Sequence, residues 1–545
     1  MTDEPIVADP SAPGVEHQPR RRISTNTAIF ALATALSRVA GLGREIVAAF
    51  FFGTTLSMSA FTIASQIPNL MSNLFAQAAL SAAFVPVFTD LLAQGRKREA
   101  FKLASTLFWI IVLVLGGLTA LGVLFAGVFI PLFTGPAFTP AADALAAGLA
   151  QVLFPVILLL GLTGLLVGIL QSYDEFTIPA LAPAAWNLVI VVVLIVLRDR
   201  FHGHDQLYAY AIAWVVATAV QLALVASALP RIDFRLKFEL DWRDPRVRRV
   251  LALMLPVTIG LGIVNLDQLL NSIFGTFVSG QAPRAIEAAF RIYMLPQGIF
   301  SVAVATVLFP TLSRQAARRD VSPMRHTLAN GMRQINLLLI PCAALLMVLS
   351  APIVRLVFQR GAFNAYSTHL TSIALFWFAF SLPFGGLNLL LTRTFFAVQR
   401  PWIPTRLAAI NIGVDIVVSV SLYKPLGIAG LVIGTAAANA VMTALQVHRL
   451  RAGFNGRLEG AQTIMITARI AVASALAAAL AWLLWSLADG LLGRSFVAQL
   501  ASLGVAIGLG ALAYGWLVLR MRIPEAGQIR ALVVGRFRER GLVPR

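Results

Sequence analysis

The sequence predicts an all-α polytopic membrane protein of about 14 transmembrane helices. They form two six-helix lobes related by a parallel internal repeat, with two further helices at the C-terminal end. Three observations predict this fold: a composition dominated by apolar residues, a series of apolar runs along almost the whole chain, and a self-similarity at an offset of 224 to 225 positions.

The composition excludes several classes of protein. Of the 545 residues, 58% are hydrophobic and 12% are charged, whereas soluble domains carry about 25% charged residues. Disordered chains do not contain so much apolar mass. The net charge of +19 comes from 43 Lys and Arg against 24 Asp and Glu. Nucleic-acid binders place such charge on a polar fold, so we expect no nucleic-acid partner.

The apolar runs define the predicted spans. Residues 1–25 are polar and contain no apolar core, so we interpret them as a cytoplasmic tail and not as a cleaved signal peptide. Runs long enough to cross a bilayer, about 20 residues each, then follow one another. The fourteen predicted spans are 27–52, 60–91, 103–133, 143–170, 178–197, 207–229, 250–278, 286–316, 327–358, 366–396, 403–422, 427–448, 462–488 and 497–519.

Basic residues predict the orientation of these spans. They gather in alternate loops, at 96–98, 231–249, 314–319 and 449–451, and in the tail 521–545, whereas the opposite loops hold scattered charges, among them Arg284. Loops rich in Arg and Lys stay in the cytoplasm, so both termini are predicted to be cytoplasmic. Attraction to anionic lipid headgroups accounts for the remaining basic character of the tails.

The internal repeat predicts the division into lobes. Pro86 within Phe84–Phe88 corresponds to Pro310 within Leu308–Leu312, an offset of 224, and two further landmarks recur at 224 to 225. Six helices per copy keep both copies in the same orientation. Transporters with parallel repeats bind substrate between the two lobes. The predicted units are the N-lobe 26–230, a basic cytoplasmic linker 231–249, the C-lobe 250–452, the last two spans within 453–520, and the tail.

Ionisable residues within the spans are functional candidates because their burial in a membrane is costly. Arg38 and Arg44 lie in the first span, and Arg291 lies in the eighth. Guanidiniums around an aqueous cavity suit a diphosphate, because arginine makes bidentate contacts to phosphate oxygens. The alternative is that these arginines pair with Glu45, Asp267 or Glu287 and only lock helices together; the residues alone favour neither interpretation.

A second polar group lies in the eleventh span. Asn411 and Asp415 are four positions apart and share one helix face. They suit Na⁺ or a relayed proton, but the pattern alone favours a polar clamp between helices.

No enzyme motif is present in the sequence. It contains no HExxH, nucleophile elbow or phosphate-binding GxxxxGK[ST]. The single Cys342 excludes a cysteine-cluster metal site, and His202 and His204 have no third ligand nearby in the sequence. We therefore expect a transporter with neither a metal nor a cofactor.

Several motifs resemble those of the MurJ/MviN family of lipid II flippases. Ser37–Glu45 (SRVAGLGRE) is similar to the family's first-helix pattern S-R-x-x-G-x-x-R-[DE]. The other stretches that carry the resemblance are Phe52-Gly53, Ala60-Phe61, Pro68–Leu70, Phe75, Phe84–Pro86, Phe290-Arg291 through Pro296, Leu308–Pro310, Phe358–Phe363, and Phe395–Gln399 with Pro404. The resemblance covers roughly residues 25–450. It implies membership of the multidrug/oligosaccharidyl-lipid/polysaccharide exporter superfamily.

The resemblance implies a bacterial inner-membrane flippase that moves the lipid-linked peptidoglycan precursor, lipid II, to the outer leaflet by alternating access. It implies that Arg38, Arg44 and Arg291 bind the diphosphate of lipid II. Supporting cavity positions are Ser37, Glu45, Ser59, Ser72 and Gln77. Membrane lipids and cell-wall synthesis proteins are the other partners that it implies.

Departures from the family pattern leave two questions open. Ser59 and Ser72 stand where the family commonly has Asp and Arg, so one cavity arginine is missing. The family's possible ion site corresponds here to Asn271, Asn411, Asp415 and Thr435, with Asn271 in place of an acidic residue. Na⁺, H⁺ and the membrane potential therefore all remain as candidate driving forces.

Two alternative functions remain. A flippase for another polyprenyl-diphosphate saccharide, such as an O-antigen or capsule unit, stays open because of Ser59 and Ser72. A drug or cation exporter of the same superfamily would have an acidic or apolar cavity.

Overall fold

The computed structural model describes residues 20–527 except 76–77, 233, 235, 319, 401 and 455–457, and in that part of the chain it contains helices and no strands. Eleven candidate spans there are long and apolar enough to cross a membrane. In addition, α1 (Arg20–Phe52) and α9 (Pro245–Val278) have 33 and 34 residues, more than the roughly 20 that a bilayer needs. The predicted all-α membrane fold is confirmed, and the count of fourteen spans stays a prediction.

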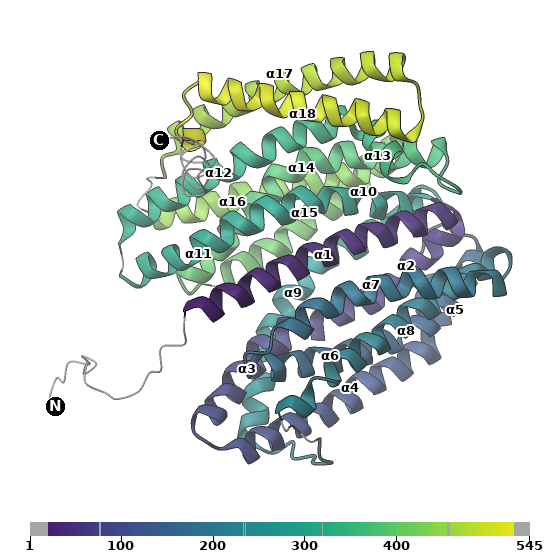
Figure 1. Cartoon of the computed structure of the whole chain (residues 1–545), viewed down its shortest axis with the longest axis vertical. Coiled ribbons are helices and arrows are strands. Elements are labelled where there is room, and N and C mark those ends of the chain that lie inside the picture. Colours follow the sequence, from purple (N-terminus) through teal and green to yellow (C-terminus); the bar gives the residue numbers. More distant parts are fainter. Residues whose placement is uncertain are drawn as a thin grey trace.

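The first repeat forms one layer of the molecule (Figure 1). Its helices after α1 are α2 (Leu56–Phe75), α3 (Ala78–Ala93), α4 (Lys97–Leu132), α5 (Pro140–Leu153), α6 (Pro155–Gln171), α7 (Thr177–Leu197) and α8 (Gln206–Ala226). Pro155 begins α6 directly after α5, at the first helical position, where the N–H that proline lacks would have no partner within the helix. The predicted span 143–170 lies within one candidate span, Pro140–Gln171, which consists of the two successive helices α5 and α6.

The second repeat forms the other half. Its helices after α9 are α10 (Ala282–Pro296), the π-helical η4 (Gln297–Ser301), α11 (Val302–Ala317), α12 (Val321–Val348), α13 (Ser350–Phe358), α14 (Ala365–Ala397), α15 (Trp402–Leu426) and α16 (Ile428–Gly453). The predicted span 327–358 is too long: α12 ends at Val348, and α13 is a separate helix of nine residues. The continuous apolar run hid this break, since both helices are apolar.

Helix α9 packs on both lobes. Val247 and Val250, in its first two turns, are buried in an apolar cluster with Phe84 and Phe88 of α3 and with Leu103 of α4. Further along, α9 contacts α10 and α15 of the second repeat. Figure 1 shows α9 passing from one half of the molecule into the other. The first helix of the C-lobe thus begins inside the core of the N-lobe.

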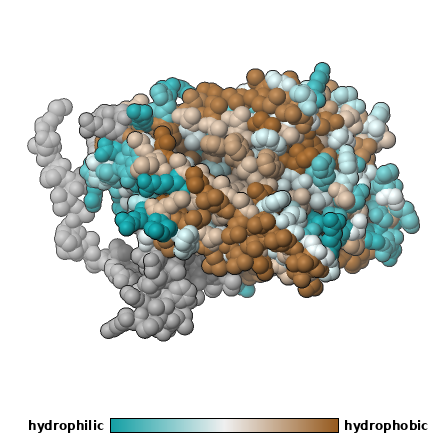
Figure 2. All heavy atoms as spheres, turned by 90° about the horizontal axis from the view of Figure 1, so that it is seen from above, coloured by the Kyte–Doolittle hydropathy of each residue, from teal (hydrophilic) through white to brown (hydrophobic). Residues whose placement is uncertain are grey.

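The two C-terminal helices, α17 (Gly460–Leu492) and α18 (Phe496–Arg520), lie along the outer side of the second repeat (Figure 1). Ion pairs attach them at both ends. Arg333 of α12 contacts Glu459 at 2.9 Å and Glu525, and Arg355 of α13 contacts Asp489 at 2.5 Å. Figure 2 shows an apolar band on this face between two hydrophilic ends, the pattern of a bilayer-spanning surface.

Candidate functional site

A polar cavity of about 370 Å³ lies between the two halves of the molecule. Both repeats line it. The lining residues are Gly41 and Arg44 of α1, Gln66 and Asn69 of α2, Trp186 and Asn187 of α7, Trp214 of α8, Asp267, Gln268, Asn271 and Ser272 of α9, Ile286, Glu287, Phe290 and Arg291 of α10, and Phe378 of α14.

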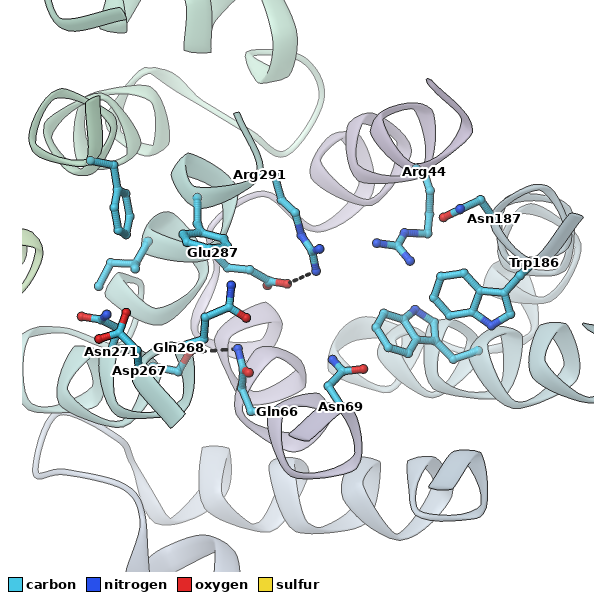
Figure 3. A pocket seen from close by; sticks show the side chains of 16 residues that line it. Arg44, Gln66, Asn69, Trp186, Asn187, Asp267, Gln268, Asn271, Glu287 and Arg291 are labelled. Carbon is cyan, nitrogen blue, oxygen red and sulfur yellow. Dashed lines mark hydrogen bonds and ion pairs between the residues drawn. The ribbon is translucent and has the colours of Figure 1, made fainter. Parts of the chain in front are cut away.

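Two predicted arginines point toward one another across this cavity (Figure 3). Arg44 comes from the first repeat and Arg291 from the second. The Arg44 guanidinium lies 4.9 Å from the ring centre of Trp186 and 5.2 Å from that of Trp214. Aromatic faces attract a cation without consuming its hydrogen-bond donors, so the two rings hold Arg44 in place and leave donors free for a ligand.

Carboxylates link these arginines into one network. Arg44 donates to Glu45 at 2.6 Å, and Arg291 donates to Glu287 at 3.1 Å. Arg284 lies between them and donates to Glu45 at 3.1 Å and to Glu287 at 3.0 Å. Three guanidiniums meet two carboxylates, so the network keeps one surplus positive charge.

The network has unused donors. The Nε atoms of Arg44, Arg284 and Arg291 are buried and form no hydrogen bond, and that of Arg291 lies 3.6 Å from a carboxylate oxygen of Glu45. Buried donors that form no hydrogen bond are costly. This arrangement suits an anion that adds oxygen acceptors, and a phosphate oxygen meets that requirement better than a neutral group because charge-assisted hydrogen bonds are the strong ones.

Arg284 is the residue that the sequence interpretation misplaced. We expected a loop charge, but Arg284 is the third residue of α10 and is 1% exposed. Residues 284, 287 and 291 are three and four positions apart and so share one helix face. This spacing was the signal that could have identified Arg284, and it was hidden because the predicted span began at residue 286.

The remaining predicted cavity residues are distributed differently. Arg38 is exposed and does not line the cavity. Its guanidinium lies against Gly298 of η4, so close that a Cβ at position 298 would be 2.4 Å from Nη1 of Arg38. Ser37 is half-buried. Ser59 is buried and accepts a hydrogen bond from the backbone N–H of Arg284 at 3.4 Å. The side chain of Ser72 and the whole of Gln77 lie outside the described residues.

Part of the predicted ion site forms a second polar cluster at one end of the cavity. Asn271 donates to Thr435 at 2.9 Å, and Thr435 donates to Asp415 at 3.4 Å. The carboxyl of Asp267 lies within hydrogen-bonding reach of the Asp415 carboxyl. Three of the four predicted residues thus meet, joined by Asp267. Asn411 is half-buried one turn before Asp415.

This second cluster offers oxygen ligands for a small cation such as Na⁺. The buried atoms Asp267 Oδ1, Asn271 Oδ1 and Asp415 Oδ2 form no hydrogen bond. All three are oxygens, the ligands that hard monovalent and divalent ions prefer. Within the described part of the chain, no group of three His, Cys, Asp or Glu residues is placed to hold a metal ion.

At the end of the molecule where α1 ends, the two halves are tied by paired backbone contacts. The N–H of Ala362 donates to the carbonyl of Phe50 at 2.8 Å, and the N–H of Ala137 donates to the carbonyl of Thr276 at 3.2 Å. A side-chain bond of 2.7 Å joins Thr54 to Ser367. Each repeat thus holds a loop of the other, and we call this the closed end because these contacts join the two halves there.

Comparisons with known proteins agree on one family. A family model described as "Lipid II flippase MurJ" matches residues 48–502. A protein of Rhizobium meliloti (strain 1021), named "Probable lipid II flippase MurJ", is 31% identical over 404 residues, which cover 73% of this chain and 75% of that protein. "Lipid II flippase MurJ" of Burkholderia cenocepacia is 30% identical over 397 residues, which cover 72% of this chain and 76% of that protein.

Solved structures show the same fold. A structure described as "Lipid II flippase MurJ, inward closed conformation" superimposes with a TM-score of 0.75 at 22% identity, covering 91% of this chain and 99% of that chain. An inward-facing multidrug resistance transporter of the MATE family superimposes with a TM-score of 0.64 at 16% identity, over 80% of this chain and 97% of the other. At such identities these likenesses concern the fold alone.

Proposed function

Since the chain belongs to the MurJ family of lipid II flippases, we propose that Arg44 and Arg291 bind the diphosphate of lipid II in the cavity between its two lobes. The chain is a multi-pass protein of the bacterial inner membrane and a transporter, not an enzyme. Its substrate is lipid II, and its surroundings are membrane lipids. The observation that carries the proposal is the pair of guanidiniums, one from each repeat, that face each other across one cavity (Figure 3).

The ion pairs give these arginines a way to release their substrate. In this structure, Glu45 accepts a hydrogen bond from Arg44, and Glu287 accepts one from Arg291. A diphosphate that enters the cavity competes with these carboxylates for the guanidinium donors. When the lobes rock apart, the carboxylates take the donors back and the headgroup leaves. Binding is therefore reversible at low energetic cost, which a transporter requires because a ligand must leave as well as enter.

Arg38 fits a role at the gap between the lobes. It belongs to α1, and its guanidinium rests on Gly298 in the segment between α10 and α11. We infer that it meets the headgroup on its way into the cavity and joins the other two arginines only after the lobes move. The polyprenyl tail stays in the lipid beside this gap.

We infer that the second polar cluster couples transport to an ion. We infer that Asp267, Asp415, Asn271 and Thr435 hold one proton or one Na⁺, which resets the lobes after release. The unpartnered oxygens of this cluster support the assignment. Asn271 and Asp267 also line the substrate cavity, so occupancy of the cluster can affect the arginine network through α9.

The orientation follows from the loop charges. We infer that both termini face the cytoplasm, because α1 begins and α18 ends at the same end of the molecule (Figure 1) and the basic loops lie on that side. The closed end, tied through Ala362 and Ala137, then faces outward. Contacts with cell-wall synthesis proteins stay a prediction.

The arginines that line the cavity disfavour a drug or cation exporter of the same superfamily, whose cavity we expect to be acidic or apolar. A cell depleted of its own flippase tests the proposal. Rescue by this chain, with loss of rescue in the Arg44→Ala plus Arg291→Ala variant, supports it. Full rescue by that double variant contradicts the role of the two arginines. Arg469→Ala is the matched control, because Arg469 is exposed on α17.

A further inference from the structure

The segment between the two repeats has an exposed apolar edge. Residues 236–241 form an extended stretch that enters a turn at Trp242, and we call 236–242 the strap. Its apolar side chains come at every second position and are exposed: Leu236 43%, Phe238 78%, Leu240 45% and Trp242 64%. Successive side chains of an extended chain point to opposite sides, so Leu236, Phe238 and Leu240 lie along one edge, and Trp242 follows them at the turn. Charged residues occupy the intervening positions.

The strap is fixed along α4. Lys102 contacts the carboxylate of Asp241 at 2.9 Å, and the indole N–H of Trp109 donates to the carbonyl of Lys237 at 3.0 Å. The N–H of Lys237 donates to Ser105 at 3.3 Å. These contacts use two turns of α4 and come from two positions of the strap, Lys237 and Asp241. The strap is therefore fixed against α4, and its apolar edge is exposed.

The contacts also place the strap at a defined depth. The first two turns of α4 are charged, with Lys97, Arg98, Glu99 and Lys102, whereas the helix beyond Trp109 is apolar and exposes Leu113 and Val114. The strap contacts α4 where its charged part meets its apolar part. In a helix that spans a bilayer, this level is the layer between headgroups and acyl chains.

Aromatic residues concentrate at the same level. The ring centres of Trp109 and Phe238 are 4.8 Å apart, and the guanidinium of Arg243 lies 5.7 Å from the ring centre of Trp242. Tryptophan beside a basic residue is typical of a membrane interface, where the ring lies among acyl chains and the cation reaches a lipid phosphate.

We propose that the strap is inserted into the interfacial layer of the phospholipid bilayer. Leu236, Phe238, Leu240 and Trp242 lie among the acyl chains, and Lys237 and Arg243 face the headgroup phosphates. Lipid is the occupant because the apolar edge continues the lipid-facing surface of α4.

The strap also sets where α9 begins. Asp244 follows it and accepts a hydrogen bond of 2.8 Å from the backbone N–H of Arg246, and Arg246 contacts Glu99 of α4. The side chain of Arg246 also donates to Asp244 and holds the pKa of that carboxyl below its usual range. The cap therefore stays charged, and the helix that both lobes share starts at a fixed depth in the membrane.

Depth-dependent fluorescence quenching tests this proposal on the full chain in vesicles of phosphatidylethanolamine and phosphatidylglycerol. Cys342 is the only cysteine, so a Cys342→Ala background allows a single fluorophore at each position. The variants are Leu236→Cys, Phe238→Cys, Leu240→Cys and Trp242→Cys, with Lys237→Cys and Arg243→Cys as matched controls from the same segment. The quenchers are iodide in water and a lipid with a doxyl group near the start of its acyl chain.

The proposal expects a pattern with a period of two. The doxyl lipid quenches the four apolar positions several-fold more strongly than positions 237 and 243, and iodide shows the reverse order. Uniform iodide quenching overturns the proposal, because the strap is then an aqueous loop. Protection from both quenchers at Phe238 and Trp242 also overturns it, since a second protein copy and not lipid then covers the edge.

Discussion

Thr62 donates a hydrogen bond of 2.9 Å to Glu287, and the two residues are 225 positions apart in the chain. This separation is the offset of the internal repeat, so the two residues occupy equivalent places in the two copies. Ser59 and Arg284 are also 225 apart and in contact. Equivalent residues of two copies touch only close to the axis that relates them. The axis of the repeat therefore passes between α2 and α10, beside the arginine network.

The same correspondence shows how the two copies have diverged. Arg284, Glu287 and Arg291 of the second repeat stand opposite Ser59, Thr62 and Gln66 of the first. One copy supplies ions and the other supplies hydroxyl and amide groups. A symmetrical site would bring like charges together at the axis, which is destabilising without compensating partners.

Arg284 is predicted to stabilise the assembled lobes. The Arg284→Met substitution leaves the buried carboxylates of Glu45 and Glu287 without the cation between them. Removing the sole partner of a buried charge costs about 3–5 kcal/mol, and the loss here is smaller because Arg44 and Arg291 still pair with Glu45 and Glu287. We expect a clear fall in the midpoint of thermal unfolding in detergent. Arg469→Met, at an exposed position of α17, is the control. An unchanged midpoint for Arg284→Met would show that the network does not hold the lobes together.

The shape of the Arg44 guanidinium is predicted to matter beyond its charge. Arg44→Lys keeps the positive charge between Trp186 and Trp214 but loses the planar fork that contacts two phosphate oxygens at once. We expect lipid II transport to fall about tenfold or more, the equivalent of at least about 1.4 kcal/mol of lost binding. Arg393→Lys, at a residue that contacts Thr306 at 2.8 Å, should retain transport. Equal transport by both variants would mean that charge alone suffices.

The second cluster is predicted to couple transport to an ion gradient. In Asp267→Asn and Asp415→Asn variants, the carboxyls that hold a proton or Na⁺ are neutral amides. We expect transport in vesicles to lose its response to an imposed pH or Na⁺ gradient, while lipid II binding persists. The gradient that drives the unchanged protein identifies the ion. If both variants respond to the gradients as the unchanged protein does, the cluster is a polar clamp between helices.

The closed end is predicted to open when the contact between Gly361 and Phe50 is disturbed. Gly361 has φ +58, and a Cβ there would lie 2.3 Å from the carbonyl oxygen of Phe50. Gly361→Ala therefore combines backbone strain with a clash that separates the loop from α1. We expect a larger outward-open population, measured as the distance between spin labels on the two lobes.

Gly95 provides the matched control for this prediction. It also has a positive φ of +73 but has no atom within 4 Å of the Cβ position. Gly95→Ala should leave the distance distribution unchanged. If the two variants give the same distribution, the contact between Phe50 and Gly361 does not keep this end closed.

The sequence predicted those residues of the site that belong to a recognisable motif or lie inside a predicted span. The first-helix pattern identified Arg44 and Glu45, and the eighth span identified Arg291. The repeat offset, found in apolar landmarks, recurs in contacts between Thr62 and Glu287. These features depend on short-range spacing or on comparison of the two copies, both of which the sequence contains.

Other features depend on three-dimensional distances that spacing does not determine. Arg38 and Arg44 are six positions apart and point to different sides of α1, and only the packing of η4 against α1 decides that Arg38 rests on Gly298. Asp267 joins Asp415 because α9 and α15 pack together. The indole rings around Arg44 come from α7 and α8, whose apolar sequences give no sign of a cation.

The most direct test of the account measures lipid II on the outer leaflet of vesicles that contain the purified chain. The unchanged protein and Arg469→Ala should expose lipid II to an added impermeant reagent at the same rate. The Arg44→Ala plus Arg291→Ala variant, if folded with an unchanged unfolding midpoint, should expose it no faster than vesicles without protein. Exposure at the unchanged rate by this double variant would contradict the claim that the two arginines carry the diphosphate across the membrane.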